Sequence, residues 1–195
     1  MRAGPLVGWA VGLGGALPGL WLAWQWHAGA LGFVPDEALL HWTGRFALVG
    51  LVATLALGPL HIAAQWRPLF AARRPMGLWA FAYAAAHLGI WALLDQGGAW
   101  AFIRAEISSM RHVQLGLAAL LLLVPLALTS TNAALRLLTL PRWNALHLLV
   151  WPATLLALLH AWMVARFENP LVVALGALTL AMLTTRAIAA LRSRG

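Results

Sequence analysis

The sequence predicts an all-α, polytopic membrane protein whose six transmembrane helices form one bundle, with both termini in the cytoplasm. Of its 195 residues, 63% are hydrophobic and only 9% are charged, whereas soluble domains have about 25% charged residues. The apolar residues fall into six runs, each near the roughly 20 residues that a helix needs to cross a bilayer. The connections between the runs are short, so we expect residues 1–195 to form a single membrane-embedded domain.

The first apolar run covers Leu6–Trp26 and is interrupted by glycines and by Pro18. A signal peptide is the alternative, because Ala28-Gly29-Ala30 loosely resembles a cleavage site. The run is longer than the roughly 7–15 apolar residues of a signal peptide, and only one arginine precedes it. We therefore expect a retained first span.

The remaining five runs are separated by loops that contain most of the charged residues. The connection Asp95–Arg111 is the longest, and within it we expect Trp100–Ile107 to form a short helix at the membrane surface. The predicted spans, the first included, cover residues 6–26, 43–60, 76–94, 112–128, 145–163 and 170–190.

The arginines indicate the orientation of the bundle, because cytoplasmic loops carry an excess of basic residues. With the N-terminus inside, nine arginines lie in inner segments and three in outer loops, while Arg45 lies within the outer end of the second span. This distribution favours cytoplasmic termini and an even number of spans. The inner set is Arg2, Arg67, Arg73, Arg74, Arg136, Arg142, Arg186, Arg192 and Arg194, and the outer set is Arg104, Arg111 and Arg166.

The formal net charge is +8, from thirteen arginines, no lysine and five acids. In so apolar a chain this charge indicates orientation in the lipid bilayer and not nucleic-acid binding, because the arginines do not cluster in one basic stripe. The sequence contains no cysteine, which excludes disulfides, iron–sulfur clusters and thiolate haem ligation. Histidine is therefore the obvious ligand for any bound metal.

Two histidines lie at similar depth in two different spans. His87 lies roughly 18 Å along its helix from Pro75, in the outer half of the third span, and His160 lies in the outer half of the fifth. Two neutral imidazoles that face each other across a bundle suit the axial positions of a low-spin b-type haem. We expect aromatic residues to line the cavity of such a haem, namely Phe81, Tyr83, Trp91 and Trp151.

A third histidine, His147, lies near the inner end of the fifth span, roughly 20 Å along the helix from His160. The intervening residues turn a straight helix by about 220° beyond whole turns, so the two imidazoles would lie on different faces. Pro152 lies between them and can kink the helix, which predicts a distortion around Leu148–Pro152. His61, at the inner end of the second span, is a candidate partner for His147.

Basic side chains near these histidines predict contacts with acidic groups. His41 and Arg45 are four residues apart and share a helix face, where Arg45 suits either a haem propionate or lipid headgroups. At the inner end, Arg73 and Arg74 suit the propionates of an inner haem, a flavin phosphate, a quinone headgroup or anionic lipid. Arg74 occupies the depth at which a second ligand on the third span would face His147, which leaves one haem or two open.

Two other interpretations of the histidines do not require haem. A histidine within a span often only bonds to a neighbouring helix, although the matched depth of His87 and His160 argues against this for the pair. A proton-coupled transporter would also use intramembrane histidines. Such a transporter needs acids within the spans as well, whereas the acids fall at span ends or in loops, namely Asp95, Glu106 and Glu168.

Four segments, in order along nearly the whole chain, resemble the MsrQ (YedZ) family of haem-binding membrane subunits. The MsrQ core is similar to the transmembrane domains of ferric reductases and NADPH oxidases, which usually carry two histidines on span three and two on span five. This chain has an arginine in place of one of the histidines on span three. The resemblance rests on His41-Trp-Thr-Gly-Arg45, Arg73-Arg74-Pro-Met-Gly-Leu-Trp79 followed by His87, Leu128-Thr-Ser-Thr-Asn132, and Arg142-Trp-Asn-Ala-Leu-His147 followed by His160.

The resemblance implies a non-catalytic electron-transfer subunit in the bacterial inner membrane. It would take electrons on the cytoplasmic side from the quinone pool, or through FMN and a cytosolic flavin reductase. It would pass them through one or two b-type haems, with His87, His160 and His147 on the iron, to MsrP. MsrP is a periplasmic molybdenum enzyme that reduces methionine sulfoxide in oxidised proteins. The outer loops, Leu31–Leu40 and Asp95–Arg111, would dock this partner.

A stand-alone ferric reductase or oxidase core, built on the same haem-binding fold, is the alternative. The sequence shows no Gly-x-Gly-x-x-Gly motif after a strand, so we do not expect NAD(P)H oxidation by this chain alone.

Overall fold

A computed structural model describes residues 3–165 and 168–192. Every regular element in this part of the chain is a helix. Arg2, Arg166 and Arg194, which were counted for the orientation, lie outside the described residues. The elements are α1 (Ala3–Gly14), α2 (Leu17–His27), α3 (Pro35–Ala64), α4 (Pro68–Ile90), the π-helix η1 (Trp91–Asp95), α5 (Trp100–Ser109), α6 (Arg111–Leu128), α7 (Asn132–Leu138), α8 (Leu140–His147), α9 (Val150–Val164) and α10 (Pro170–Arg192).

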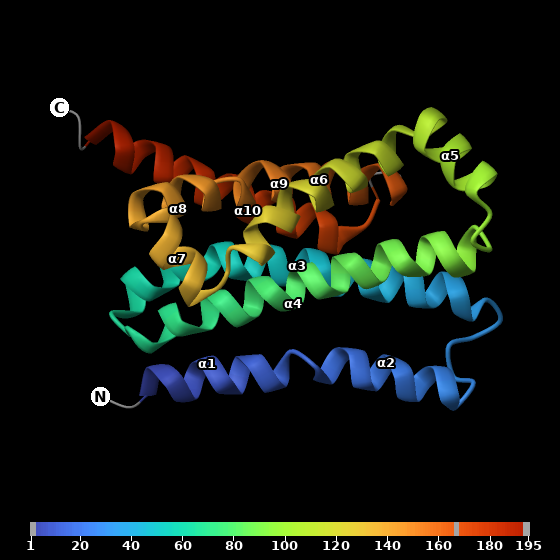
Figure 1. The fold of residues 1–195 in the computed structure, drawn as a ribbon, viewed down its shortest axis with the longest axis horizontal. Coiled ribbons are helices and arrows are strands. Elements are labelled where there is room, and N and C mark those ends of the chain that lie inside the picture. Colours follow the sequence, from blue (N-terminus) through green and yellow to red (C-terminus); the bar gives the residue numbers. More distant parts are fainter. Residues whose placement is uncertain (1–2, 166–167, 193–195) are drawn as a thin grey trace.

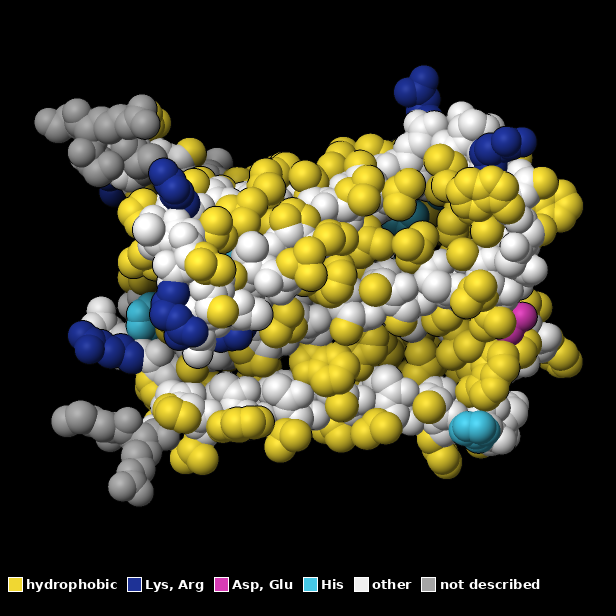
Figure 2. Space-filling view, in the orientation of Figure 1, with side chains coloured by type: hydrophobic (Ala, Val, Ile, Leu, Met, Phe, Trp, Pro, Cys, Tyr) yellow, Lys and Arg dark blue, Asp and Glu magenta, His cyan; other side chains and the backbone are white. Residues whose placement is uncertain are grey.

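Six helical segments of the described chain are long and apolar enough to cross a membrane, which confirms the all-α, six-helix prediction. Three of them are built from two consecutive helices each: α1 with α2, α4 with the π-helix η1, and α8 with α9. Figure 2 shows apolar side chains along the flank of the bundle and arginines at its ends. The segments are Ala3–His27, Pro35–Ala64, Pro68–Asp95, Arg111–Leu128, Leu140–Val164 and Pro170–Ala189.

The helices α3 and α4 form the central pair of the bundle. The helix α1 packs against α4, and α6 packs against α9, so that α1 and α2 lie on one side of the central pair and α6, α9 and α10 on the other (Figure 1). The start of α1 and the end of α10 lie at the same end of the bundle as α7 and α8, and α5 lies at the opposite end (Figure 1). We call these the α7 end and the α5 end.

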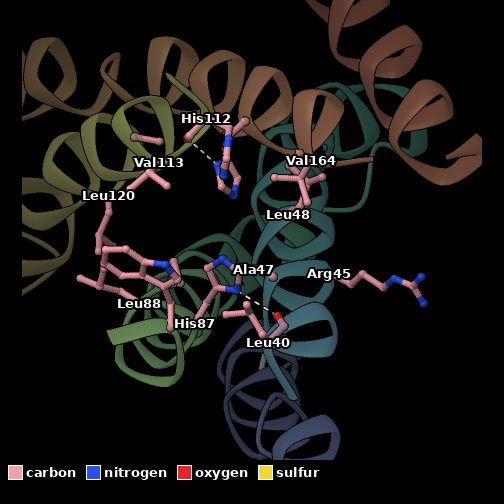
Figure 3. Close-up of a pocket in the computed structure, with 18 of the residues that line it drawn as sticks. Leu40, Arg45, Ala47, Leu48, His87, Leu88, His112, Val113, Leu120 and Val164 are labelled. Atoms are coloured by element: carbon pink, nitrogen blue, oxygen red, sulfur yellow. Dashed lines mark hydrogen bonds between the residues drawn. The ribbon is translucent and has the colours of Figure 1, made fainter. Parts of the chain in front are cut away.

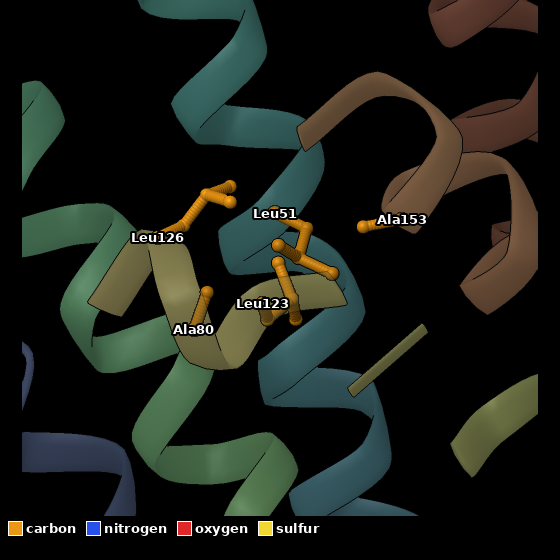
Figure 4. Packing of buried hydrophobic residues seen from close by; sticks show 5 residues of the cluster. All are labelled: Leu51, Ala80, Leu123, Leu126 and Ala153. Atoms are coloured by element: carbon orange, nitrogen blue, oxygen red, sulfur yellow. The ribbon is translucent and has the colours of Figure 1, made fainter. Parts of the chain in front are cut away.

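A cluster of buried aliphatic residues joins four of the helices in the middle of the bundle (Figure 4). Small residues let the backbones approach closely here, as is common between membrane helices. A Cβ atom added to Gly50 of α3 would lie 3.0 Å from the Ala80 Cβ of α4. The cluster consists of Leu51, Ala80, Leu123, Leu126 and Ala153.

The first span is broken between α1 and α2. Pro18 has no N–H to donate, and the hydroxyl of Tyr83 is inserted between the backbone groups of Gly15 and Gly19. Tyr83 Oη donates to the Gly15 carbonyl over 2.7 Å and accepts from the Gly19 N–H over 2.9 Å, in place of the direct i to i−4 bond. The indole of Trp79 donates to the Gly12 carbonyl over 2.7 Å. Side chains of α4 therefore satisfy the backbone groups that this break exposes.

The fifth span is also broken, at Leu148 and Leu149, between α8 and α9. This confirms the distortion predicted from the spacing of His147 and His160 and from the position of Pro152. The predicted surface helix also forms, as α5, and extends to Ser109.

Candidate functional site

A cavity of about 550 Å³ lies at the α5 end of the bundle, between α3, α4, α6 and α9. Its volume falls within the roughly 300–1,000 Å³ typical of cofactor and ligand cavities. Most of its walls are aliphatic, with a smaller number of polar side chains. The polar and charged residues that line it are His41, Arg45, His87, Asp95, Glu106, His112, His160 and Asn169.

The cavity brings together the two histidines that the sequence places at matching depth. The rings of His87, from α4, and His160, from α9, have centroids 6.0 Å apart and planes at 81° to each other. Each ring bonds through Nδ1 to a backbone carbonyl of a neighbouring helix. His87 Nδ1 bonds to the Leu40 carbonyl over 2.9 Å, and His160 Nδ1 bonds to the His112 carbonyl over 2.7 Å.

These two bonds assign the tautomer of both rings, because a carbonyl oxygen can only accept. Nδ1 must carry the hydrogen in each neutral imidazole, which leaves Nε2 with a free lone pair for a metal ion. Two nitrogen–metal bonds of about 2 Å each, plus the radii of the rings, require roughly 6 Å between the ring centres. The spacing of His87 and His160 therefore fits a single metal centre held between them, and the cavity between apolar walls fits a large flat cofactor around it.

The predicted pair His41 and Arg45 lies on the rim of this cavity, and both side chains are exposed. His41 Nδ1 donates to the Glu37 carbonyl over 2.8 Å. The Arg45 guanidinium lies 5.2 Å from the centre of the Trp42 ring, and its side chain points away from His87 (Figure 3). The charge of Arg45 is thus available at the mouth and not in the cavity interior.

Two residues at the mouth of the cavity, His112 and Glu106, were not predicted from the sequence to line it. The ring of His112 lies 6.1 Å from that of His160. Glu106 of α5 accepts a hydrogen bond from Trp91 Nε1 over 3.1 Å. This bond ties α5 to the end of α4. Their signal was weak, because the position of Glu106 depends on how the short helix α5 folds back over the bundle, and the contacts of His112 depend on which face of α6 meets α9.

Only one of the four aromatic residues that were predicted to line the cavity does so. Trp91 is among its walls. Tyr83 faces α1 and α2 instead, Phe81 packs against the aliphatic cluster of the bundle centre, and Trp151 lies beneath the Arg186 guanidinium. Depth along the helix was insufficient to predict them, because residues at one depth face different neighbours.

At the α7 end, His147 lies apart from the other predicted ligands. Its ring stacks on Trp143 with centroids 3.7 Å apart, and its Nδ1 donates to the Trp143 carbonyl over 3.0 Å. Its Nε2 is buried and has no hydrogen-bond partner among the described residues. The ring of His61, its candidate partner, lies 5.9 Å from that of Phe70 and bonds to the Trp66 carbonyl.

The two adjacent arginines of α4 point to different partners. The guanidinium of Arg73 lies 5.4 Å from the centre of the Phe70 ring. Arg74 donates to Asn132 Oδ1 over 2.8 Å and so connects α4 to the start of α7. This bond links two of the segments on which the family resemblance rests.

Comparisons with known proteins agree on one family of membrane proteins. A family described as "Ferric reductase like transmembrane component" matches residues 43–159, which include His87, His147 and His160. A Rhodospirillum rubrum protein named "Protein-methionine-sulfoxide reductase heme-binding subunit MsrQ" is 40% identical over 180 residues, covering 91% of this chain and 86% of the relative.

Two further relatives carry the same name. The Xanthomonas oryzae protein is 40% identical over 148 residues, which cover 76% of this chain and 67% of the relative. The Salmonella paratyphi B protein is 39% identical over 175 residues, which cover 89% and 87%.

Proposed function

Because the chain belongs to the ferric reductase like transmembrane component family, we propose that it is a membrane electron-transfer subunit that holds a b-type haem between His87 and His160. The observation that carries this proposal is the pair of facing imidazoles, with centroids 6.0 Å apart in an apolar-walled cavity. The relatives' printed name, which includes "heme-binding subunit", supports the same cofactor.

The residues around the cavity would prepare it for haem in three ways. The carbonyls of Leu40 and His112 hold both Nδ1 hydrogens, so both Nε2 atoms present lone pairs to the iron. The aliphatic walls would surround the ring of the haem with apolar side chains. Arg45 would supply positive charge and hydrogen-bond donors on the rim, beside His41, where propionates would emerge. When bound, the haem iron supplies one-electron oxidation and reduction.

The direction of electron flow follows from the orientation that the arginines favour. With the α7 end in the cytoplasm, electrons would enter among Arg73, Arg74 and His147 from the quinone pool or from a flavin such as FMN. The buried, unpartnered Nε2 of His147 is a candidate ligand for a second haem at this end. Electrons would leave at the α5 end, in the periplasm of a bacterial inner membrane.

The acceptor would be a separate reductase that docks at the α5 end, on the Leu31–Leu40 and Asp95–Arg111 segments. The relatives are named as subunits of a protein-methionine-sulfoxide reductase, which supports the periplasmic molybdenum enzyme MsrP as this acceptor. The second candidate function, a stand-alone ferric reductase, is favoured by the family description. The two candidate functions differ in the electron acceptor. Only an electron-transfer subunit for MsrP requires that MsrP, supplied with methionine sulfoxide, reoxidises the reduced haem.

A visible spectrum of the protein purified after expression with haem supply tests the proposal. The wild type is expected to show a Soret band, and His87→Ala and His160→Ala should each lose most of it, because each removes one axial nitrogen. His27→Ala, at the end of α2, is the matched control and should keep the wild-type spectrum. A wild type without a Soret band, or full haem content in both cavity variants, would refute the assignment.

A further inference from the structure

His87 and His160 are bonded in the same way by two different helices, α3 and α6. On α3, the Leu40 carbonyl bonds to His87 Nδ1, and Gly44 follows four residues later. On α6, the His112 carbonyl bonds to His160 Nδ1, and Gly116 follows four residues later. Each imidazole thus bonds to the carbonyl of residue i, and the residue at i+4 has no side chain.

Helix geometry explains why position i+4 matters. Side chains of an α-helix lean toward its N-terminus, so a side chain at i+4 covers the surface above residue i. The carbonyl of residue i already accepts the N–H of residue i+4 within the helix. Its second lone pair can accept from an outside donor, and the missing side chain at i+4 leaves room for a ring to approach it. The Leu40 carbonyl also accepts from Thr43 Oγ1 over 3.0 Å.

The distances at both glycines show that the rings occupy this space. A Cβ atom on Gly116 would lie 2.9 Å from His160 Nδ1 and 3.1 Å from its Cε1. A Cβ atom on Gly44 would lie 3.1 Å from both Nδ1 and Cε1 of His87. In each case the three nearest atoms all belong to the histidine ring. Gly50 differs, because its nearest atoms belong to Ala80 of the packed helix.

We propose that Gly44 and Gly116 are positioning residues, each forming with the carbonyl four residues before it a seat that fixes one haem-ligating imidazole. The seats hold Nδ1–H on the backbone, turn Nε2 into the cavity, and set the two ring planes nearly perpendicular, at 81°. The inference rests on the proposed haem function and adds the residues that orient its ligands. It also gives a role to the glycine in His41-Trp-Thr-Gly-Arg45.

The variants Gly116→Ala and Gly44→Ala test the proposal against two matched controls. Gly58→Ala, on the same helix as Gly44, and Gly176→Ala, on α10, add a Cβ atom that meets nothing within 4 Å. Alanine is the better helix former at all four positions. A defect confined to the two cavity variants therefore cannot come from helix propensity.

Loss of haem from the holoprotein to excess apomyoglobin gives the first measurement. Removing a group that orients a metal-ligating histidine typically weakens metal binding by roughly 10- to 100-fold. We expect an effect of this size for Gly116→Ala and a smaller one for Gly44→Ala, whose added Cβ atom has more room. Both controls should release haem at the wild-type rate.

Electron paramagnetic resonance of the ferric protein gives an independent measurement. Perpendicular imidazole planes leave two iron d orbitals nearly equal in energy, which produces a strongly anisotropic low-spin signal with one large g value. The wild type and the controls should show this signal, and Gly116→Ala should shift it as the His160 ring turns. A merely structural glycine would lower the protein yield without moving the signal.

Three outcomes would overturn the proposal, and they separate it from the proposed function. Wild-type haem release together with a wild-type signal in Gly116→Ala would show that the seat is not needed, while haem binding itself stands. If Gly116→Ala does not elute as a monodisperse protein, Gly44→Ala takes its place. Wild-type haem release together with a wild-type signal in Gly44→Ala then overturns the proposal. A wild type without haem would refute the proposed function and the seats with it.

Discussion

At the scale of single residues, the polar side chains of this bundle bond mainly to backbone carbonyls. His87, His160 and Trp79 each donate to a carbonyl of another helix, and Tyr83 bridges a carbonyl and an N–H. A backbone group without a partner is costly in hydrocarbon. Tyr83 and Trp79 therefore satisfy backbone groups at the break of the first span. His87 and His160 bond to carbonyls within helices, which hold the two rings in one orientation.

Replacing Tyr83 by Phe is expected to destabilise the protein by roughly 1–2 kcal/mol. The change keeps the ring but removes the hydroxyl that joins the Gly15 carbonyl and the Gly19 N–H. Thermal unfolding in detergent measures the loss. Thr184→Val removes an exposed hydroxyl that bonds within its own helix and should change the melting temperature much less. Equal melting of Tyr83→Phe and the wild type would contradict the role of Tyr83.

For single residues, depth along a helix could be predicted from the sequence, but contacts between helices could not. The depth of His87 and His160 could be predicted because rise per residue is fixed, and the structure brings their rings together. The contacts of Gly116 and His112 could not, because they depend on which face of α6 meets α9. Tyr83 was misplaced for the same reason: its ring turns to α1 and α2, away from the cavity.

At the scale of elements, the π-helix η1 controls how α4 ends above the cavity. Such turns shift the helix register locally and are frequent at functional sites. Here η1 begins at Trp91, whose indole bonds to Glu106 of α5. The bond fixes a short surface helix, with Trp100 and Phe102 exposed on it, against the mouth of the cavity.

Replacing Trp91 by Phe is expected to loosen α5, because it removes the donor that holds Glu106. The loss of one hydrogen bond to a carboxylate should speed amide hydrogen exchange in α5 by roughly 5- to 30-fold. Hydrogen exchange with mass spectrometry measures this, with α10 as an internal reference. Trp100→Phe, at an exposed position of α5 itself, is the control. Unchanged exchange in Trp91→Phe would show that α5 is held by other contacts.

The two broken spans differ in how far the sequence predicts them. The break between α8 and α9 followed from Pro152 and from two histidines that a straight helix would turn apart. The break between α1 and α2 did not, although Pro18 was visible, because a proline in a span is tolerated when neighbouring helices satisfy the freed groups. Those neighbours are side chains of α4, which lie far along the sequence.

At the scale of the whole molecule, six apolar segments and their order were predictable from the apolar runs along the sequence, because a bilayer fixes the length of a span. The distribution of charge is consistent with one direction across the membrane. Figure 2 shows arginines gathered at the α7 end, with a smaller group over α5. Burial could not be predicted in this way, since lipid-facing and core-facing positions are equally apolar.

The orientation can be tested directly, because the protein has no cysteine of its own. Ser108→Cys, on α5, should react with a membrane-impermeant maleimide in intact cells of a Gram-negative host. Ala133→Cys, on α7, should react only after the inner membrane is permeabilised. Both positions are exposed. The opposite labelling pattern would place the α7 end outside and reverse the direction of electron flow.

The dependence of the first span on α4 has a consequence for biogenesis. During synthesis, α1 and α2 leave the ribosome well before Trp79 and Tyr83 are made, so the backbone groups of Gly12, Gly15 and Gly19 do not yet have their α4 partners. The nascent first span would therefore rest against the translocon or the lipid interface and take its final conformation only when α4 inserts beside it. The order of translation would thus delay the final conformation of this span until the third span is made.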